Sequence, residues 1–286
     1  MTTTLRVVHT TGYRYEGRAT GSINEARMIP RSDAEQTVLS SRIEIAPTAW
    51  THRWTDYFGT GVVAFEIHEP HEEMRLVATS TVDVTRPPAQ GPAAGEGIHW
   101  EELGTDELRS RLAEYLTMSP LVEPAEGLRA LVASHREGAA EPRELVDALV
   151  AAVTGHVAYV PGSTDVTTRA AQAWEVGSGV CQDLSHVLIG ALRAAGVPAR
   201  YVSGYLGPGL ASAPVVTVAT GQCHAWVEAW LGRWVPLDPT NRAPVLEEHV
   251  AVGHGRDYAD VAPLRGVFTG APAESMFVDV VVTRMR

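Results

Sequence analysis

Three side chains in this sequence are of the types that together carry out thiolate chemistry: Cys181, His224 and Asp238, in that order along the chain. A thiol serves as the nucleophile, an imidazole takes up its proton, and a carboxylate orients the imidazole. Any chain of this length contains such residues, so their types alone predict little. The sequence around each of them adds the structural context that this chemistry needs.

The segment after Cys181 is predicted to be a helix that is buried on one face. Apolar residues recur at the helical period over 184–195, and Gly196 and Pro198 follow as stop signals. Cys181 then lies at the helix N-terminus, where unpaired amides and the helix dipole favour a thiolate. The alternative is a buried structural cysteine, which is a common use of this residue.

Residues 222–231 alternate in the manner of a β-strand, with His224 among tryptophans on one face and small side chains on the other. We expect the small face to pack against the Cys181 helix or a neighbouring strand, which lets His224 project into a cleft. Residues 234–237 are predicted to be the return strand of a hairpin, and Asp238 begins the turn that ends it. The hairpin brings Asp238 back towards His224, whereas taken alone Asp238 is a turn carboxylate that caps its own backbone.

Cys223 adjoins His224 and is one of only two cysteines in 286 residues. Strand alternation sends its side chain to the face opposite His224, so we predict that Cys223 is small core filler that faces away from the cleft. A disulfide between Cys181 and Cys223 stays open at this point, although it would consume the nucleophile. Two cysteines give no disulfide framework and match a reducing cytosol.

Taken together and in this order, the motifs resemble those of the transglutaminase-like superfamily of papain-type cysteine enzymes. They are Gly-Val-Cys-Gln-Asp (179–183), Gly-Val-Pro-Ala-Arg-Tyr-Val-Ser-Gly-Tyr (196–205), His-Ala-Trp-Val-Glu-Ala-Trp (224–230) and Leu-Asp-Pro-Thr-Asn (237–241). More narrowly, the chain resembles a bacterial two-domain branch with an N-terminal β domain. That likeness lies in Asn24-Glu25-Ala26-Arg27, Asp56-Tyr57-Phe58-Gly59 and Gly255-Arg256-Asp257-Tyr258-Ala259-Asp260-Val261.

The resemblance implies that Cys181 is the nucleophile, His224 the base and Asp238 the orienting group. It implies acyl transfer, in which the thiolate attacks an amide carbonyl, a thioester forms, and water or an amine resolves it. Members of this branch are described as candidate cysteine proteases, and cross-linking is not implied for them. The expected partner is therefore a peptide, protein or small amide substrate. No cofactor is expected, and the cysteines lack the spacing of a zinc site.

The charge balance and the N-terminal sequence exclude several other classes. The net charge is −11, from 23 Lys and Arg against 34 Asp and Glu, and no long basic run occurs, which disfavours nucleic-acid binding. No apolar stretch has membrane-spanning length, and the first residues lack the basic start and apolar centre of a signal peptide. We therefore expect a cytoplasmic protein that does not bind membranes, and the oligomeric state stays open.

The predicted fold class is α+β. A papain-like, transglutaminase-like core, in which the cysteine-bearing helix packs on an antiparallel sheet, follows a β-rich N-terminal domain. The domain boundaries are 1–85 for the β domain, 86–97 for a Pro- and Gly-rich linker and 98–286 for the core. Strands are predicted over 5–10, 38–45, 62–68, 74–84 and 276–283, and helices after Thr105, over 127–135 and from Pro142.

The sequence also offers candidates for the oxyanion donors and for the walls of the cleft. The backbone amide of Cys181 is the expected oxyanion donor, and Gln172 is a weak candidate for the second donor. Tyr205, Trp226 and Trp230 are candidates for lining the cleft, although such aromatic residues are more often core.

The leading function is cysteine-dependent hydrolysis of amides or peptides through an acyl-enzyme. One alternative is acyl transfer to an amine, as in transglutaminases or arylamine acetyltransferases. Another is a non-catalytic binding module that keeps the fold. Fast modification of Cys181 by iodoacetamide at neutral pH favours an enzyme over a module.

Overall fold

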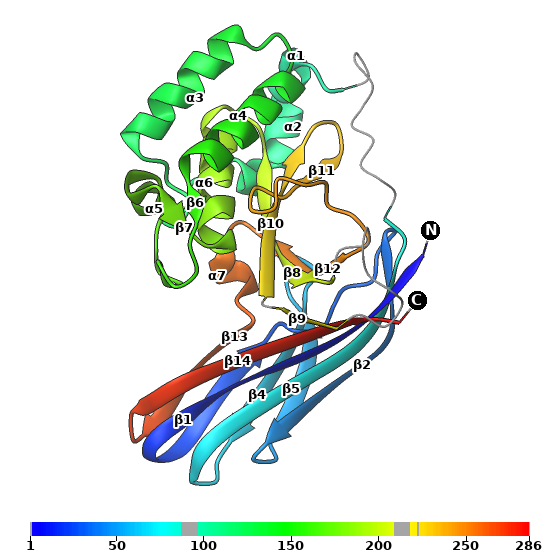
Figure 1. Cartoon of the computed structure of the whole chain (residues 1–286), viewed down its shortest axis with the longest axis vertical. Coiled ribbons are helices and arrows are strands. Elements are labelled where there is room, and N and C mark those ends of the chain that lie inside the picture. The colour runs from blue at the N-terminus through cyan, green and yellow to red at the C-terminus, as the bar shows by residue number, and fades with distance from the viewer. Residues whose placement is uncertain (1, 87–96, 209–217, 222, 286) are drawn as a thin grey trace.

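Two β-sheets organise the chain, and helices cover one of them (Figure 1). The computed structural model describes residues 2–86, 97–208, 218–221 and 223–285. Apart from its two end residues, the linker predicted over 86–97 lies outside the described residues. In the described part of the chain, no helix is both long enough and apolar enough to cross a membrane.

The β domain is one large antiparallel sheet built around a long first strand. Its strands are β1 (Thr3–Ala26), β2 (Gln36–Ala46), β3 (Trp50–Thr55), β4 (Gly61–Ile67), β5 (His71–Val84), β9 (Val218–Gly221), β13 (Leu264–Gly270) and β14 (Ala273–Arg284). Strand β1 has 24 residues and pairs with β4, β5, β13 and β14 along its length. The four strands predicted in the N-terminal region from alternation are all present, in β1, β2, β4 and β5, although β4 ends one residue before the predicted strand over 62–68 does.

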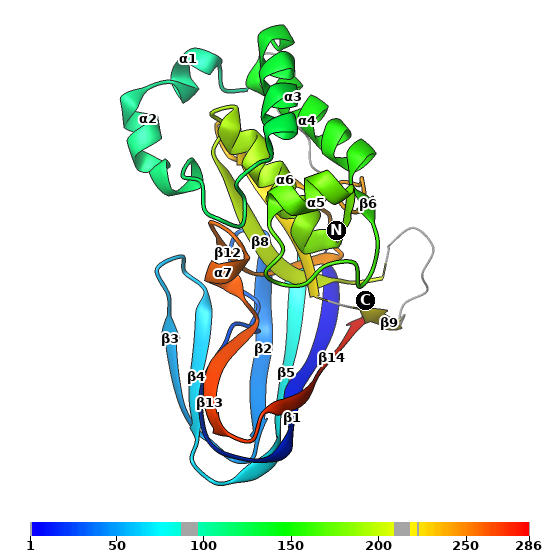
Figure 2. The ribbon, with the colours of Figure 1, turned by 90° about the vertical axis from the view of Figure 1, so that its left-hand side faces the viewer.

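The two C-terminal strands belong to this sheet, whereas the domain boundaries predicted from the sequence include all of 98–286 in the core. Strand β14 pairs with β1 from Leu5 opposite Arg284 to Tyr15 opposite Ala273, and β13 pairs with the end of β1. The strand predicted over 276–283 is therefore real, but its assignment to the core is wrong. Alternation identifies a strand and its buried face but does not name the partner strand. Figure 2 shows β1, β13 and β14 side by side.

The core has a four-stranded antiparallel sheet in the order β11-β10-β8-β12. Its strands are β8 (Ala199–Leu206), β10 (Cys223–Trp230), β11 (Trp234–Leu237) and β12 (His249–Gly255). The helices are α1 (Trp100–Leu103), α2 (Asp106–Arg111), the 3-10 turn η1 (Ala113–Tyr115), α3 (Glu126–Gly138), α4 (Pro142–His156), α5 (Ala170–Val176), α6 (Cys181–Ala194) and α7 (Tyr258–Val261). A short parallel pair, β6 (Ala158–Tyr159) and β7 (Ser178–Gly179), precedes α6. The predicted helices correspond to α2, α3 and α4, and the fold class is α+β as predicted.

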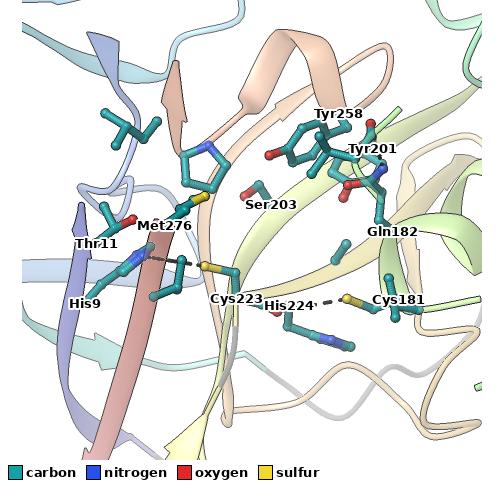
Figure 3. Close-up of a pocket in the computed structure, with 16 residues that line it drawn as sticks. His9, Thr11, Cys181, Gln182, Tyr201, Ser203, Cys223, His224, Tyr258 and Met276 are labelled. Atoms are coloured by element: carbon teal, nitrogen blue, oxygen red, sulfur yellow. Dashed lines mark hydrogen bonds between the residues drawn. The ribbon is translucent and has the colours of Figure 1, made fainter. Parts of the chain in front are cut away.

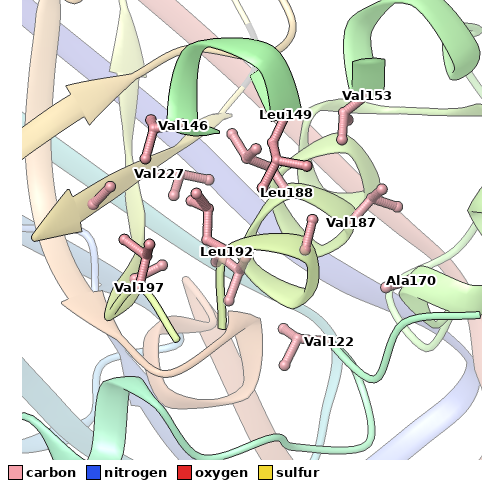
Figure 4. Packing of buried hydrophobic residues seen from close by; sticks show 14 of the residues in the cluster. Val122, Val146, Leu149, Val153, Ala170, Val187, Leu188, Leu192, Val197 and Val227 are labelled. Atoms are coloured by element: carbon pink, nitrogen blue, oxygen red, sulfur yellow. The ribbon is translucent and has the colours of Figure 1, made fainter. Parts of the chain in front are cut away.

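Helix α6 is the centre of the core. It packs against α4 and α5 on one side and against β8 and β10 on the other, so that residues 182–193 are all buried. Leu188 and Leu192 lie among valines and leucines from the neighbouring elements (Figure 4). Burying one such leucine stabilises the fold by roughly 1.5–3 kcal/mol. Gly190 permits the loop before α3 to pack closely on α6, because a Cβ there would lie 2.1 Å from the carbonyl oxygen of Val122.

The β domain is joined to the core by buried polar contacts as well as apolar ones. The side chain of Gln36 donates to the carbonyl of Ala251 (2.7 Å) and accepts from its amide (2.9 Å), as another strand would. The guanidinium of Arg86 donates to the carbonyls of Leu246 and His249. These contacts fix β12 and the segment before it against the β domain, next to the candidate site.

Candidate active site

Cys181 is the first residue of α6, as the sequence predicts, and a buried carboxylate holds this helix end in place. Asp183 accepts hydrogen bonds from the amide of Val180 (2.8 Å) and the hydroxyl of Thr164 (2.6 Å). Gly179 allows this packing, since a Cβ there would lie 2.6 Å from the Cβ of Asp183. Burial raises the pKa of Asp183 even though both hydrogen bonds act to lower it. The N–H of Cys181 has no acceptor within its own helix, because it belongs to the first turn.

His224 and Asp238 come together across the predicted hairpin. Nε2 of His224 lies 2.8 Å from Oδ2 of Asp238, and both side chains are buried. The thiol of Cys181 donates to the backbone carbonyl of Cys223 (3.9 Å), and it lies close enough to the imidazole of His224 to raise the pKa of that ring. Burial acts to lower the pKa of His224, but its hydrogen bond to Asp238 and its interaction with the Cys181 thiol outweigh burial and raise that pKa to about 9. The structure therefore groups all three residues singled out from the sequence.

Asp238 accepts hydrogen bonds at both carboxylate oxygens. Oδ1 accepts the backbone amides of Thr240 (2.9 Å) and Asn241 (3.1 Å), which is the turn-capping role that its sequence context suggests. Oδ2 accepts from His224, from the side-chain amide of Asn241 (2.7 Å) and from His249 (3.2 Å). Although burial acts to raise its pKa, these bonds hold the pKa of Asp238 well below its usual range. Asp238 thus both caps its turn and binds the imidazole.

His249 also belongs to this cluster, although no motif in the sequence indicates it. Its Nδ1 accepts a hydrogen bond from the amide of Leu246 (3.2 Å). Its Nε2 therefore carries the proton and donates a hydrogen bond to Asp238. The ligand-type atoms of His224, Asp238 and His249 all lie within 4.8 Å of one another, as in a metal site. The hydrogen bonds to the shared carboxylate account for this grouping without a metal. His249 follows Asp238 by 11 residues in a separate strand, and no local pattern in the sequence connects the two.

A cavity of about 350 Å³ lies beside Cys181 and His224, between the core and the β domain. Cys223 lines it too, as Figure 3 shows. Its Sγ lies 3.8 Å from Nε2 of His9, a residue of β1, and both cysteines are free thiols. The contact with His9 agrees with the prediction that the Cys223 side chain lies on the face of β10 opposite His224. The prediction that Cys223 faces away from the cleft is wrong. The β domain encloses space beside β10 and turns this face into a cavity wall.

Cys223 is expected to resist alkylation under conditions in which Cys181 reacts. Burial raises the pKa of the Cys223 thiol to about 12, so little thiolate forms there near neutral pH. Cys223→Ala is expected to keep activity near wild type and to cost on the order of 1 kcal/mol of stability. Mass spectrometry after substoichiometric iodoacetamide treatment measures the site of labelling. Label on Cys223, or an inactive Cys223→Ala variant, contradicts this assignment.

None of the four other sequence candidates is among the described residues that line the cavity, although the ring of Trp226 packs 6.1 Å from that of His224. Gln172 is exposed and its side chain caps α5 by accepting the amide of Arg169 (2.9 Å), so it is not positioned as an oxyanion donor. Tyr205 and Trp226 are buried below the site, and Trp226 packs edge-on against His249 with ring centroids 5.4 Å apart. Trp230 contacts Trp234 at the far end of the sheet. Strand alternation places Trp226 and Trp230 on the face of β10 that carries His224, but of these three residues only His224 lines the cavity.

Other side chains line the cavity in place of these candidates. Gln182, Ser203 and Tyr258 contribute polar atoms to its wall (Figure 3). Gln182 follows the nucleophile directly, and its side-chain amide donates to the carbonyl of Val166 (3.2 Å). Gln182 and Tyr258 stand in the motifs that suggested the family, but only the folded chain shows that they border the same space.

Comparisons with known proteins agree with this architecture. Residues 5–83 match the model of the bacterial transglutaminase-like N-terminal region, and residues 129–239 match that of the transglutaminase-like superfamily. An uncharacterised protein of Mycobacterium leprae is 40% identical over 98% of this chain and 99% of its own length. A stretch of 118 residues, 39% of this chain, is 36% identical to a protein-glutamine gamma-glutamyltransferase of Pseudomonas aeruginosa and covers 18% of that protein. The crystal structure of a candidate cysteine protease from Cytophaga hutchinsonii has the same fold, with a TM-score of 0.75 at 21% identity, over 98% of this chain and 90% of that one.

Proposed function

The chain belongs to the transglutaminase-like superfamily, and from this premise we propose that it is a cysteine-dependent hydrolase of peptide or other amide bonds. Cys181 is the nucleophile, His224 the general base and acid, and Asp238 the orienting carboxylate. One observation carries the proposal: a single buried imidazole binds the carboxylate at 2.8 Å and has its pKa raised by the neighbouring thiol at a helix N-terminus. This is the geometry that activates a cysteine as a nucleophile.

The proposed reaction proceeds through two acyl transfers. The Cys181 proton passes to His224, and the thiolate sulfur forms a bond to the substrate carbonyl carbon. The backbone N–H of Cys181 donates to the resulting oxyanion, because it has no helical acceptor. The imidazolium of His224 then protonates the leaving amine as the C–N bond breaks, which leaves a thioester. Water, deprotonated by His224, attacks the thioester, and the thiol and a carboxylic acid are released.

Acyl transfer to an amine is the second candidate reaction, supported by the similarity to a glutamyltransferase over part of the chain. The two reactions share the nucleophile, the base and the thioester, and differ only in which molecule resolves the thioester. Adding a primary amine to the assay separates them. Transfer gives an amide product that increases with amine concentration, whereas hydrolysis gives a free acid at all amine concentrations.

Activity screening of wild type beside Cys181→Ala tests the proposed function directly. Peptide, isopeptide and small-amide libraries cover the substrate classes that the chemistry permits. We expect at least one class to be turned over by wild type alone, with a thioester on Cys181 that hydroxylamine releases. Products that form equally with the alanine variant contradict an enzymatic role. The absence of any turnover, combined with iodoacetamide labelling of Cys181 no faster than that of free cysteine, also contradicts it.

The rate of the proposed reaction is expected to fall as the pH rises through about 9. The pKa of His224 is raised to about 9, so its protonated form persists well above neutral pH and is lost above that value. The protonated imidazole is the acid that the leaving amine requires. A profile of kcat/KM between pH 6 and 10.5 measures this alkaline limb. A rate that keeps increasing to pH 10.5 contradicts the role of His224 as general acid.

A further inference from the structure

The cavity beside Cys181 has walls from both domains. Strands β1 and β14 contribute His9, Thr11, Met276 and Val278, and the core contributes the face that carries Tyr201 (Figure 3). A chain that folded as the core alone would leave this side of the site open. The β domain therefore shapes the space in which a group next to the reacting carbonyl must lie.

The lining of this cavity is uncharged apart from the Cys181–His224 pair. Charged residues make up 20% of the whole chain, yet none of the described residues that line the cavity is Asp, Glu, Lys or Arg. A charged substrate group in this space would lose water and find no counter-ion, which costs free energy. The lining thus disfavours charged groups of either sign.

His9 does not supply a charge either. The hydroxyl of Tyr205 donates to the carbonyl of Met28 (3.1 Å), so its oxygen accepts the Nδ1 proton of His9 (3.0 Å). Nε2 then carries no proton in the neutral ring, and the sulfur of Cys223 lies 3.8 Å from Nε2 and 3.9 Å from Nδ1. Burial lowers the pKa of His9 to about 4, so the ring is neutral at physiological pH.

Two apolar side chains continue from the cavity onto the open surface of β14. Met276 and Val278 line the cavity, yet they are 54% and 50% exposed. They share a face of the strand with Val280, which is buried, because alternate residues of a strand point the same way. This face therefore leads from the buried end of the site to its open end, and an apolar group bound there would cover side chains that now contact water.

We propose that this cavity and the adjoining face of β14 form a specificity site that selects amides in which an uncharged, apolar group flanks the reacting carbonyl. The inference rests on the proposed function, because it assumes that the reacting carbonyl lies at Cys181. It assigns the β domain a part in substrate selection. The binding contribution comes from apolar area removed from water at Met276 and Val278.

Covalent labelling of Cys181 tests this proposal without requiring turnover. The probes are three iodoacetamides that share one warhead and carry an N-benzyl, an N-carboxymethyl or an N-aminoethyl group. Wild type is expected to react with the benzyl probe about tenfold faster than with either charged probe, after correction for each probe's rate with free cysteine. Mass spectrometry confirms that the label is on Cys181.

Val278→Glu is expected to remove the preference for the benzyl probe and to favour the aminoethyl probe. Met276→Glu, at a more exposed position, is the second variant should the first fold poorly, and thermal melts report folding. Ser275→Glu is the matched control, because it adds the same charge to the exposed opposite face of the same strand, and it is expected to label as wild type does. Equal rates for the three probes on wild type, or equal effects of Val278→Glu and Ser275→Glu, overturn the proposal.

Labelling and turnover together distinguish a failure of the specificity site from a failure of the proposed function. A benzyl preference that Val278→Glu abolishes, in a protein that hydrolyses no amide, supports the specificity site and contradicts the proposed function. Hydrolysis that depends on Cys181 but ignores the charge of the flanking group supports the function and overturns the specificity site.

Discussion

Replacing Cys181 with alanine is expected to abolish turnover, with a loss in kcat on the order of 10⁴-fold or more, while the fold is retained. The thiol supplies the atom that bonds to the substrate, and no other group in the site can replace it in the proposed mechanism. The side chain is only partly buried at the start of α6, so its removal leaves a small cavity. Rates under saturating substrate measure the effect, and thermal melts report the fold.

His224→Ala and the double variant with Cys181→Ala complete this test. His224→Ala is expected to match the loss from Cys181→Ala within about tenfold, and the double variant is expected to be little worse than either single change, because members of a triad act as a unit. Two losses that multiply would indicate that the residues act independently. Substantial activity in either single variant would remove the triad from the mechanism.

Local patterns in the sequence predict much of the core because the same residues specify both an element and its buried face. The apolar stripe after Cys181 predicts α6. The small residues of β10 predict the face of the strand that packs on α6, and Ala225 and Val227 are buried there. The positions of Gly232 and Asp238 predict a hairpin whose return strand, β11, spans the residues expected. These features depend on interactions within about fifteen residues, which is the range that periodicity and turn signals cover.

Long-range pairing is the part that the sequence could not supply. The pairing of β14 with β1 joins residues at opposite ends of the chain, and nothing in either segment names the other. The same limit explains the errors at the site. Trp226 lies on the predicted face of its strand, but it is buried in a cluster with Val202, Val245 and Ala251 and does not line the cavity. His9 and Met276 reach the cavity only because the β domain docks there.

Asp238→Asn is expected to lower kcat by on the order of 10²–10⁴-fold, less than the loss of Cys181, because the residue orients the base and does not bond to substrate. Asparagine has only one accepting oxygen. Its NH₂ group would therefore face either the donors on His224 and His249 or the two backbone amides, and those donors would lose their acceptor. The imidazole of His224 would lose its fixed tautomer and a hydrogen bond that raises its pKa. The alkaline limb of the rate profile is therefore expected to move to lower pH than in wild type.

The same substitution is expected to destabilise the fold by about 1–3 kcal/mol, because buried donors lose their acceptor. The pKa of Asp238 is depressed in the folded protein, so the stabilisation from its charge is present above the ordinary aspartate pKa and is lost as the pH falls below it. The stability gap between wild type and Asp238→Asn is thus expected to narrow below about pH 4. Urea unfolding at pH 7 and pH 3.5 measures it.

His249→Phe separates the orienting role of Asp238 from its structural one. It removes one hydrogen bond from Oδ2 but leaves the bonds from His224, Asn241 and the backbone in place. We therefore expect a smaller loss in kcat than for Asp238→Asn, and an alkaline limb close to that of wild type. Equal losses for the two variants, with the alkaline limb shifted alike, would mean that His249 positions the base as directly as the carboxylate does. An Asp238→Asn variant with wild-type kcat would leave the carboxylate only its turn-capping role, since its contact with His224 would then be dispensable for the reaction.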